Sequence, residues 1–396
     1  MAMLRATLAA LLLSFLPFAV AVAIHPAGHP SSNKVDYDVI VVGGGPAGLS
    51  ATSGLARVRR KTLMLDSGEY RNAATREMHD VIGNDGTVPS VFRALAREQI
   101  SKYPTVTMKN ATVMSITPYN NGSRFRVVDD KGHDYTARRI ILGTGMKDIL
   151  PSTPGVVEAW GKGIFWCPWC DGYEHRDQPF GILGPLPDVM GGVLEIKTLN
   201  SDIIAFVNGT YTPENEAALA AKYPNWKAQL AAYNVKINNL TITSIDRLQD
   251  GAEVHDPEKG LQFDKFLVNL ADGSSVERNA FLANFPSDQL STLPAKLNLT
   301  MVDKKIQVNS DMQTSLNGVY AVGDANSDGS TNVPHAMFSG KRAAVYIHVA
   351  LAREESLASI SKRTLSARML EEETHRMIGN DLEELWHKVE LRATEN

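Results

Sequence analysis

The only two cysteines of this 396-residue chain are Cys167 and Cys170, three positions apart. This spacing favours a paired use of the two thiols, either as a redox-active disulfide or as half of a metal site. A zinc site is disfavoured, because zinc takes about four ligands, no other thiolate exists and the nearest histidine, His175, stands alone. A structural staple is also disfavoured, because so short a disulfide loop constrains the unfolded chain very little. The spacing therefore predicts a redox-active disulfide.

Residues beside the cysteines could take part in the same chemistry. Asp171 follows the second cysteine directly, and a carboxyl group beside a thiol can shuttle its proton. The alternative interpretation of Asp171 is a turn residue before Gly172. Three tryptophans, Trp160, Trp166 and Trp169, lie close to the pair in sequence. We interpret them first as packing and second as a wall for a flat apolar substrate.

A second chemical signal is a glycine-rich turn that follows the strand-like residues 37–42. Gly43, Gly45 and Gly48 have the spacing of a dinucleotide-binding turn between a strand and a helix. They permit a tight turn, close approach of a pyrophosphate and close packing of the helix on the strand, respectively. Asp66, about 18 residues after the last glycine, ends the next strand and is expected to bind an adenosine ribose. The alternative is a glycine turn that binds no phosphate.

A second nucleotide motif begins at residues 179–187 but is not completed. Two prolines occupy the turn, where they remove N–H donors that a phosphate needs, and Gly191 and Gly192 come too late. The next strand, residues 202–208, is not followed by arginines that could bind a ribose 2′-phosphate. The pattern predicts a nucleotide-binding fold without its cofactor site.

Other segments complete the expected elements. Short alternating stretches between residues 106 and 141 predict an antiparallel meander, and residues 139–145 predict a buried strand that ends in a glycine turn. Residues 318–325 predict a strand that delivers an aspartate to a turn, and a helix is expected to start at residues 332–344. The charged residues 354–396 predict a docked pair of terminal helices, with partner binding as the alternative.

The N-terminus predicts a secretory protein. Residues 1–23 hold one arginine, an apolar run and small residues at a cleavage position, and residues 24–34 form a polar spacer. The apolar run is short for a membrane anchor, which is the alternative, so no stable membrane insertion is expected after signal cleavage. N-glycosylation sequons occur at Asn110, Asn121, Asn208, Asn239 and Asn298. We therefore expect an extracellular, N-glycosylated protein.

The composition restricts the class of partner. The length suggests two domains of ordinary size. The formal net charge is -4, and no cluster of lysines and arginines resembles a surface that follows a phosphate backbone. We expect no nucleic acid among the partners.

Taken in chain order, these motifs resemble the low-molecular-weight thioredoxin reductase group of flavoproteins. The versions at residues 66–72, 166–172 and 332–336 are more similar to the fungal FAD-dependent dithiol oxidases, the gliotoxin-oxidase-like branch. The resemblance runs from about residue 37 to residue 352. The signal segment, the sequons and the C-terminal extension depart from the pattern of that branch.

The resemblance implies an α/β, two-domain Rossmann-like FAD/NAD(P)-binding fold with three-layer ββα architecture. The FAD-binding domain is expected to be discontinuous, formed by residues 35–155 and 289–353. Residues 156–288 are expected to form the inserted domain, with the cysteine pair and a degenerate NADPH-like site. Homodimerisation is expected from the resemblance alone.

The resemblance also implies that FAD is held non-covalently. Asp324 is expected to bind the ribityl or phosphate region, and the helix start at residues 332–344 is expected to face the flavin pyrimidine edge. The implied cofactor-binding residues are Gly43, Gly45, Pro46, Ala47, Gly48, Asp66, Ser67, Arg71, Asn72, Thr144, Gly145, Gly323, Asp324, Pro334, His335 and Ala336.

The implied activity is that of a thiol oxidase. A dithiol substrate, a small molecule or a peptide, is expected to form a mixed disulfide at Cys167, while Cys170 passes two electrons to FAD and O2 reoxidises it to give H2O2. Asp171 and His335 are the expected acid–base residues; the alternative for His335 is packing beside the cofactor. An NADPH-dependent disulfide reductase and a non-catalytic secreted flavoprotein are the alternative functions.

Overall fold

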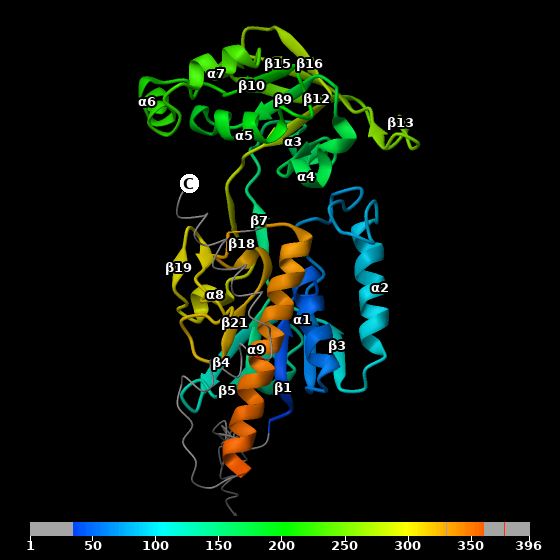
Figure 1. Ribbon diagram of the computed structural model, residues 1–396, viewed down its shortest axis with the longest axis vertical. Helices are drawn as coiled ribbons and strands as arrows, with labels where there is room; N and C mark the ends of the chain where they lie inside the picture. Colours follow the sequence, from blue (N-terminus) through cyan, green and yellow to red (C-terminus); the bar gives the residue numbers. More distant parts are fainter. Residues whose placement is uncertain (1–34, 330, 360–375, 377–396) are drawn as a thin grey trace, which may run out of the picture. The chain divides into compact units, whose positions relative to one another are not determined.

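The computed structural model describes residues 35–329, 331–359 and 376. The predicted signal peptide and spacer, and the predicted C-terminal extension beyond residue 359 apart from Arg376, lie outside the described residues. Figure 1 shows the elements of the described part. Among the helices of that part, none combines the length and the apolar character needed to cross a bilayer.

The first sheet has seven strands, in the order β3-β2-β1-β6-β5-β4, with β21 paired to β6. Strands β1, β2, β3, β6 and β21 pair in parallel, whereas β4, β5 and the start of β6 form an antiparallel meander. The strands are β1 (Tyr37–Val42), β2 (Thr62–Asp66), β3 (Val106–Asn110), β4 (Val113–Tyr119), β5 (Arg124–Asp129), β6 (Asp134–Leu142) and β21 (Val319–Ala321).

The predicted meander is confirmed for residues 113–142 but was placed too early. Residues 106–110 pair in parallel with β2 and so belong to the parallel part of the sheet. Helix α2 (Pro89–Ser101) makes the crossover between β2 and β3, which a parallel pair requires. The half-buried, edge position of β3 gives it the alternating pattern that resembled an antiparallel strand.

Strand β1 shows why the first sheet has two covered faces. Val39 and Val41 pack against helices α1 (Pro46–Arg57) and α9 (Val333–Ser359), whereas Ile40 and Val42 pack on the side of the meander and of α8 (Leu293–Lys296). Because alternate side chains of a strand point to opposite faces, this continuous apolar run serves two cores. The result is a three-layer ββα arrangement.

The second sheet repeats this arrangement. Its five strands pair in parallel, in the order β11-β10-β9-β17-β8. Helices cover one face, and a three-stranded antiparallel sheet contributes the core on the other. The strands are β8 (Ile164–Phe165), β9 (Phe180–Leu183), β10 (Ile203–Phe206), β11 (Lys236–Asn238) and β17 (Ala280–Ala283); the helices are α5 (Val189–Ile196), α6 (Pro213–Lys222) and α7 (Trp226–Ala232); the antiparallel strands are β12 (Ile242–Gln249), β15 (Lys265–Leu270) and β16 (Ser275–Arg278).

The chain passes between the two sheets through one short antiparallel pair, β7 (Met146–Asp148) and β18 (Ser287–Gln289) (Figure 1). The remaining short elements are α3 (Val156–Ala159), α4 (Pro168–Asp171), η1 (Tyr173–His175), η2 (Leu186–Asp188), β13 (His255–Asp256), β14 (Leu261–Gln262), β19 (Met301–Val302), β20 (Lys305–Ile306) and η3 (Gly323–Ala325). Two parallel sheets of Rossmann type, the second inserted into the first, confirm the predicted fold class.

Candidate active site

A cavity of about 210 Å³ lies at the carboxyl ends of the parallel strands of the first sheet. The residues that follow β1, β2, β3, β6 and β21 all contribute to its wall. Open α/β sheets bind their ligands at this edge, so the topology alone marks the cavity as a binding site. The predicted residues that line it are Gly43, Gly45, Pro46, Ala47, Ser67, Arg71, Asn72, Thr144, Gly145, Gly323, Asp324 and Ala336; Gly48, Asp66, Pro334 and His335 are not in its wall.

The glycine turn brings the start of helix α1 to the cavity. A Cβ atom on Gly43 would lie 2.2 Å from the Gly143 carbonyl oxygen, and one on Gly48 would lie 1.9 Å from the Gly43 carbonyl oxygen. Both positions therefore require glycine, although Gly48 itself is packed behind the turn. The helix has no side-chain cap and no acidic residue in its first turn. Its first N–H groups and positive dipole end suit a pyrophosphate.

Asp66 supports this turn from behind. Its Oδ1 accepts hydrogen bonds from the N–H groups of Gly44 and Gly68, both at 3.1 Å. Its Oδ2 accepts from the Tyr70 hydroxyl at 2.6 Å and from Arg97 at 3.0 Å. Burial and the hydrogen bond to Asp66 raise the pKa of Tyr70 to about 12. The carboxylate is thus committed to the turn, and the structure does not bring it to the cavity wall where a ribose would bind.

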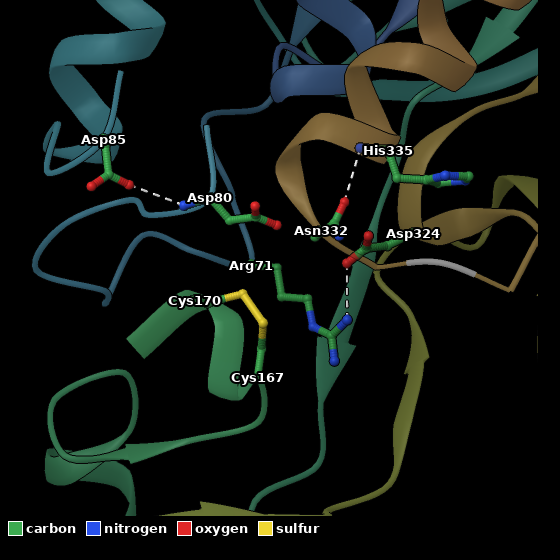
Figure 2. Close-up of a disulfide and its surroundings, with 8 residues drawn as sticks. All are labelled: Arg71, Asp80, Asp85, Cys167, Cys170, Asp324, Asn332 and His335. Carbon is green, nitrogen blue, oxygen red and sulfur yellow. Dashed lines mark hydrogen bonds and ion pairs between the residues drawn. A yellow bond between two sulfur atoms is a disulfide. The ribbon is translucent and has the colours of Figure 1, made fainter. Parts of the chain in front are cut away.

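Arg71 joins two acidic groups at the other end of the cavity. Its Nη1 lies 2.9 Å from Asp324 Oδ2, and its Nε and Nη2 both donate to Asp148. Its guanidinium also lies 5.0 Å from the centre of the Trp166 ring. Burial raises the pKa of Asp324, and the positive charge of Arg71 opposes part of that rise. Figure 2 shows the ion pair with Asp324. Asp148 lies on β7, three residues after Gly145, and the sequence analysis did not select it.

The predicted disulfide is present in the structure. Cys167 and Cys170 are bonded, with their Cα atoms 5.2 Å apart, and both residues are half-buried (Figure 2). Cys167 precedes α4 directly, and the N–H of Cys170 donates to its carbonyl oxygen at 3.1 Å. Trp166, the residue before Cys167, lines the cavity. The redox pair is therefore one residue away from the wall of the cofactor cavity.

The other two tryptophans have different environments. Trp160 is buried and stacks on Trp166, with ring centres 5.2 Å apart. Trp169, between the two cysteines, is 65% exposed. Packing therefore accounts for Trp160, whereas Trp169 presents its ring to solvent beside the disulfide.

Asp171 carries a proton at neutral pH. Burial, and secondly the like charge of Glu174, raise the pKa of Asp171 to about 8, with Arg76 opposing the rise. A carboxyl group that stays protonated beside a disulfide can donate a proton to a departing thiolate. This environment supports the predicted acid–base role more strongly than that of a turn residue.

His335 does not reach the disulfide. Its ring points away from the cysteines in Figure 2, and its Nε2 lies 2.7 Å from the buried Asp328 carboxylate. Its N–H donates to Asn332 Oδ1 at 2.9 Å, so Asn332 caps helix α9. The cavity wall includes Asn332, Val333 and Ala336 from this helix start. The helix and the contribution of Ala336 were predicted correctly, but Asn332 and Val333 line the cavity beside it rather than Pro334 and His335.

Behind the disulfide lies a group of charged residues that the sequence analysis missed. The fully buried Asp264 interacts with Arg76, Arg247 and His175, whose Nε2 lies 3.0 Å away. Burial alone would raise the pKa of Asp264, but hydrogen bonds from His175 and Arg76 hold it well below its usual range. These residues are far apart in sequence, which is why no local motif announced them. Among the described residues, no cluster of three or more histidine, cysteine, aspartate or glutamate side chains could hold a metal ion.

The second sheet has a corresponding turn after β9, and polar groups of this turn form internal hydrogen bonds. The N–H of Leu186 donates to Thr210 Oγ1 at 3.0 Å, and Asn284 Nδ2 donates to Asp188 Oδ2 at 2.6 Å. Pro185 and Pro187 carry no N–H group. The donors that a dinucleotide phosphate needs at this position are therefore either absent or used internally.

Comparisons with known proteins agree with this architecture. A family model described as "Pyridine nucleotide-disulphide oxidoreductase" matches residues 37–196. A "Probable thioredoxin reductase" of Arthroderma benhamiae is 54% identical over 364 residues, which cover 88% of this chain and 90% of that protein. "Thioredoxin reductase tcpT" of Claviceps purpurea is 31% identical and covers 78% of this chain and 92% of its own. The crystal structure of an oxidoreductase from Agrobacterium tumefaciens matches with a TM-score of 0.68 and 28% identity, over 80% of this chain and 98% of that one.

Proposed function

This chain belongs to the fungal thioredoxin reductase-like proteins of the pyridine nucleotide-disulphide oxidoreductase family, and we propose that it is an FAD-dependent dithiol oxidase. In this proposal a dithiol substrate becomes a disulfide at Cys167 and Cys170, and O2 accepts the electrons to give H2O2. The observation that carries the proposal is the contrast between the cavity at the first glycine turn and the turn after β9, where the Leu186 N–H is used internally and two prolines carry no N–H.

FAD is the cofactor, and the residues of the cavity fit it. The helix α1 start supplies N–H donors for a pyrophosphate. Thr144 lines the cavity, and its buried hydroxyl oxygen has no hydrogen-bond partner among the described residues. A buried polar atom without a partner is rare, so a ligand group is expected there. When bound, FAD accepts two electrons from a dithiol and passes them to a second acceptor.

The protein's own residues account for the thiol chemistry. A substrate thiolate attacks the sulfur of Cys167, the bond between the cysteines breaks, and Cys170 departs as a thiolate. The second substrate thiolate then attacks the substrate sulfur of this mixed disulfide and releases Cys167. One S–S bond is lost on the protein and one is formed on the substrate, so the substrate is oxidised by two electrons. Asp171, protonated at neutral pH, donates a proton to the departing Cys170 thiolate.

A second candidate is an NADPH-dependent disulfide reductase, because the relatives are named thioredoxin reductases. Such an enzyme needs a nicotinamide dinucleotide at the crevice of the second sheet. The hydrogen bond from Leu186 to Thr210 and the two prolines of the turn oppose that site. The oxidase is therefore the better supported function.

Anaerobic mixing of the purified yellow protein with each reductant distinguishes the two candidates. We expect a dithiol such as dithiothreitol to bleach the flavin absorbance, and NADPH to leave it unchanged. In air, the dithiol should then be consumed with release of H2O2, and a Cys170→Ser variant should bind FAD without turnover. Fast bleaching by NADPH would instead establish the reductase. Absence of both flavin bleaching and H2O2 release with a panel of dithiols would favour a non-catalytic flavoprotein.

We also propose that the protein is secreted and N-glycosylated. All of the sequon asparagines are exposed: Asn110, Asn121, Asn208, Asn239 and Asn298. Exposure is what attachment of a glycan requires. A shift in mass after treatment of the secreted protein with an N-glycosidase would support this proposal, and retention of the unmodified full-length chain inside the cell would contradict it.

A further inference from the structure

Thiol–disulfide exchange at the cysteine pair moves protons as well as electrons. A small cavity of about 10 Å³ lies beside the end of α4, and Asp171, Glu174 and His79 contribute to its wall. This volume is at the limit for one water molecule. The remaining wall residues are Arg76, Glu77, Gly161, Gly163, His175 and Gln262. The cavity thus places the acid beside the disulfide in one compartment with a second acid and a histidine.

Glu174 is a buried acidic residue in the wall of this compartment. The residue is 8% exposed. Its Oε1 lies 3.4 Å from His79 Nε2, whereas its Oε2 is buried and has no hydrogen-bond partner among the described residues. A buried carboxylate oxygen without a hydrogen-bond partner is rare, so a water molecule is expected at this atom.

His79 connects the compartment with the surface. Its side chain is 16% exposed, and its Nδ1 lies 3.5 Å from Oδ1 of Asp85, a side chain that is 71% exposed. The loop that carries Asp85 is drawn in Figure 2. Glu77 Oε2 lies 3.7 Å from His79 Nε2. One imidazole therefore has a buried carboxylate at Nε2 and an exposed carboxylate at Nδ1, which is the arrangement of a proton carrier.

The other charged groups of the compartment are already committed. Both ring nitrogens of His175 are engaged, with Nδ1 3.0 Å from the Asp171 carbonyl oxygen and Nε2 3.0 Å from Asp264 Oδ2. Arg76 is paired with Asp264 and Asp250. Both ring nitrogens of His175 are therefore occupied, and the Arg76 guanidinium does not release a proton, so neither group is a proton carrier here.

We propose that Glu174 and His79 form a proton relay between Asp171 and the solvent at Asp85. Asp171 exchanges its proton with Glu174, directly or through one water molecule, and His79 passes it from Glu174 to the surface. The inference rests on the proposed thiol chemistry at Cys167 and Cys170, but it does not depend on O2 as the electron acceptor. Both residues act through Asp171 rather than by contact with the substrate.

The pKa of Asp171, raised to about 8 by burial and by Glu174, makes such a relay useful. A buried acid with a proton to donate must regain it before the next turnover. The groups that face it from neighbouring elements are Glu174, Arg76 and the carbonyl-bound His175. Of these three residues, only Glu174 contacts His79, the histidine that reaches the surface.

The test is a single-turnover reaction of the full-length holoprotein with dithiothreitol in the absence of O2, followed by flavin bleaching. We expect His79→Ala to lower the rate constant about a hundredfold, at the low end of the range for assisted proton transfer. Added imidazole should restore most of the rate, because it fits the space of the missing ring. His255→Ala, at an exposed histidine on β13, is the matched control and should react like the wild type.

A second readout does not depend on turnover. The pH profile of cysteine alkylation by iodoacetamide in the reduced protein should be the same in His79→Ala and wild type, because a relay changes the rate of proton exchange and not the thiol pKa. The rate of flavin bleaching should fall at high pH, where Asp171 loses its proton. In Glu174→Gln this fall should begin at a lower pH, because the substitution removes the like charge that raises the pKa of Asp171.

The outcomes separate the two proposals. An unchanged rate in His79→Ala, a loss that imidazole does not restore, or an altered alkylation profile overturns the relay. If the wild type is bleached by dithiothreitol but produces no H2O2 in air, the oxidase proposal fails while the relay is still tested. Imidazole rescue with an unchanged alkylation profile establishes the relay.

Discussion

The turns after β1 and β9 occupy equivalent positions, each after a strand of a parallel sheet, but only the first borders a cavity of about 210 Å³ among those described. After β1, the turn needs glycine at Gly43 and Gly48, and it leaves the start of α1 open to a large cavity. After β9, the corresponding turn contains two prolines, and the N–H of Leu186 is taken up by Thr210. Both sheets have parallel strands with helices on one face. The comparison teaches that the fold provides the location of a nucleotide site, whereas a few backbone N–H groups decide whether the site exists.

The largest effect is expected from matched glycine substitutions in the helices that follow the two turns. In Gly48→Ala the new Cβ would lie 1.9 Å from the Gly43 carbonyl oxygen, so the turn must move, at a cost of about 3 kcal/mol or more and with loss of bound flavin. Gly191 in α5 has open space at this position, and Gly191→Ala should stabilise the protein by about 0.5–1 kcal/mol. Flavin absorbance and thermal unfolding measure both changes. A Gly48→Ala protein with full flavin content would break the comparison.

The next largest effect is expected at Arg71, whose charge is shared by Asp148 and Asp324 at the cavity of the first sheet. Arg71→Met leaves Asp148 and Asp324 without their shared cation, which should lower the free energy of unfolding by about 3 kcal/mol and weaken flavin binding. Arg278→Met, in the second sheet, removes one ion pair to the exposed Asp202 and should cost about 1 kcal/mol. Chemical denaturation gives the free energy of unfolding of both variants. Equal decreases in the two variants would show that the ion pairs of Arg71 are no more important for stability than the ion pair of Arg278.

A smaller effect is expected from the proton that Asp171 holds beside the disulfide, in the half of the molecule that contains the second sheet. The pKa of Asp171 is raised to about 8 in the folded protein, so between about pH 4 and pH 8 the folded state holds a proton that the unfolded chain releases. Wild-type stability should therefore fall as pH rises through this range, and Asp171→Asn should make the pH dependence clearly flatter. Denaturant unfolding at about pH 5 and pH 8 is the measurement. Parallel pH dependence in the two proteins would show that Asp171 has an ordinary pKa.

The smallest effect is expected at the closed turn itself. Thr210→Val removes the acceptor of the Leu186 N–H and should cost about 1 kcal/mol of stability. NADPH binding should not appear, because one freed donor does not replace those missing at Pro185 and Pro187. Titration of the variant with NADPH, followed by fluorescence, checks this. Micromolar binding would mean that a single hydrogen bond closed the second crevice.

Local patterns predicted most of the fold. Strand β1, the glycine turn and the start of α9 were all visible as short runs with clear punctuation, because their conformations depend on neighbours in sequence. Residues 106–110 were assigned to the wrong part of the sheet, since an edge strand has the same alternation in parallel and antiparallel pairing. The partner of a strand depends on a crossover, and periodicity alone does not contain that information.

The site was predicted where its residues follow one another and missed where they do not. Cys167, Cys170 and Asp171 were found because they form one motif. Asp66 supports the turn through hydrogen bonds that the sequence did not show, with Tyr70 and Arg97 at its Oδ2, and its expected contact with a ribose stays a prediction. His79 and Glu174 are 95 residues apart, and only the packing of the loop against η1 brings them together.

The pairing of β7 with β18 has a consequence for how such a protein can change. Met146 is the register partner of Gln289, and the Leu290 N–H donates to the Gly145 carbonyl oxygen at 3.2 Å. The chain therefore leaves and re-enters the flavin-binding half at neighbouring points. A single gene segment between these points can be exchanged or deleted with one short bridge of peptide, and the cofactor half keeps its strand order. Replacement of the segment between β7 and β18 could thus give an ancestor a new electron donor or acceptor without a change in the site that holds the flavin.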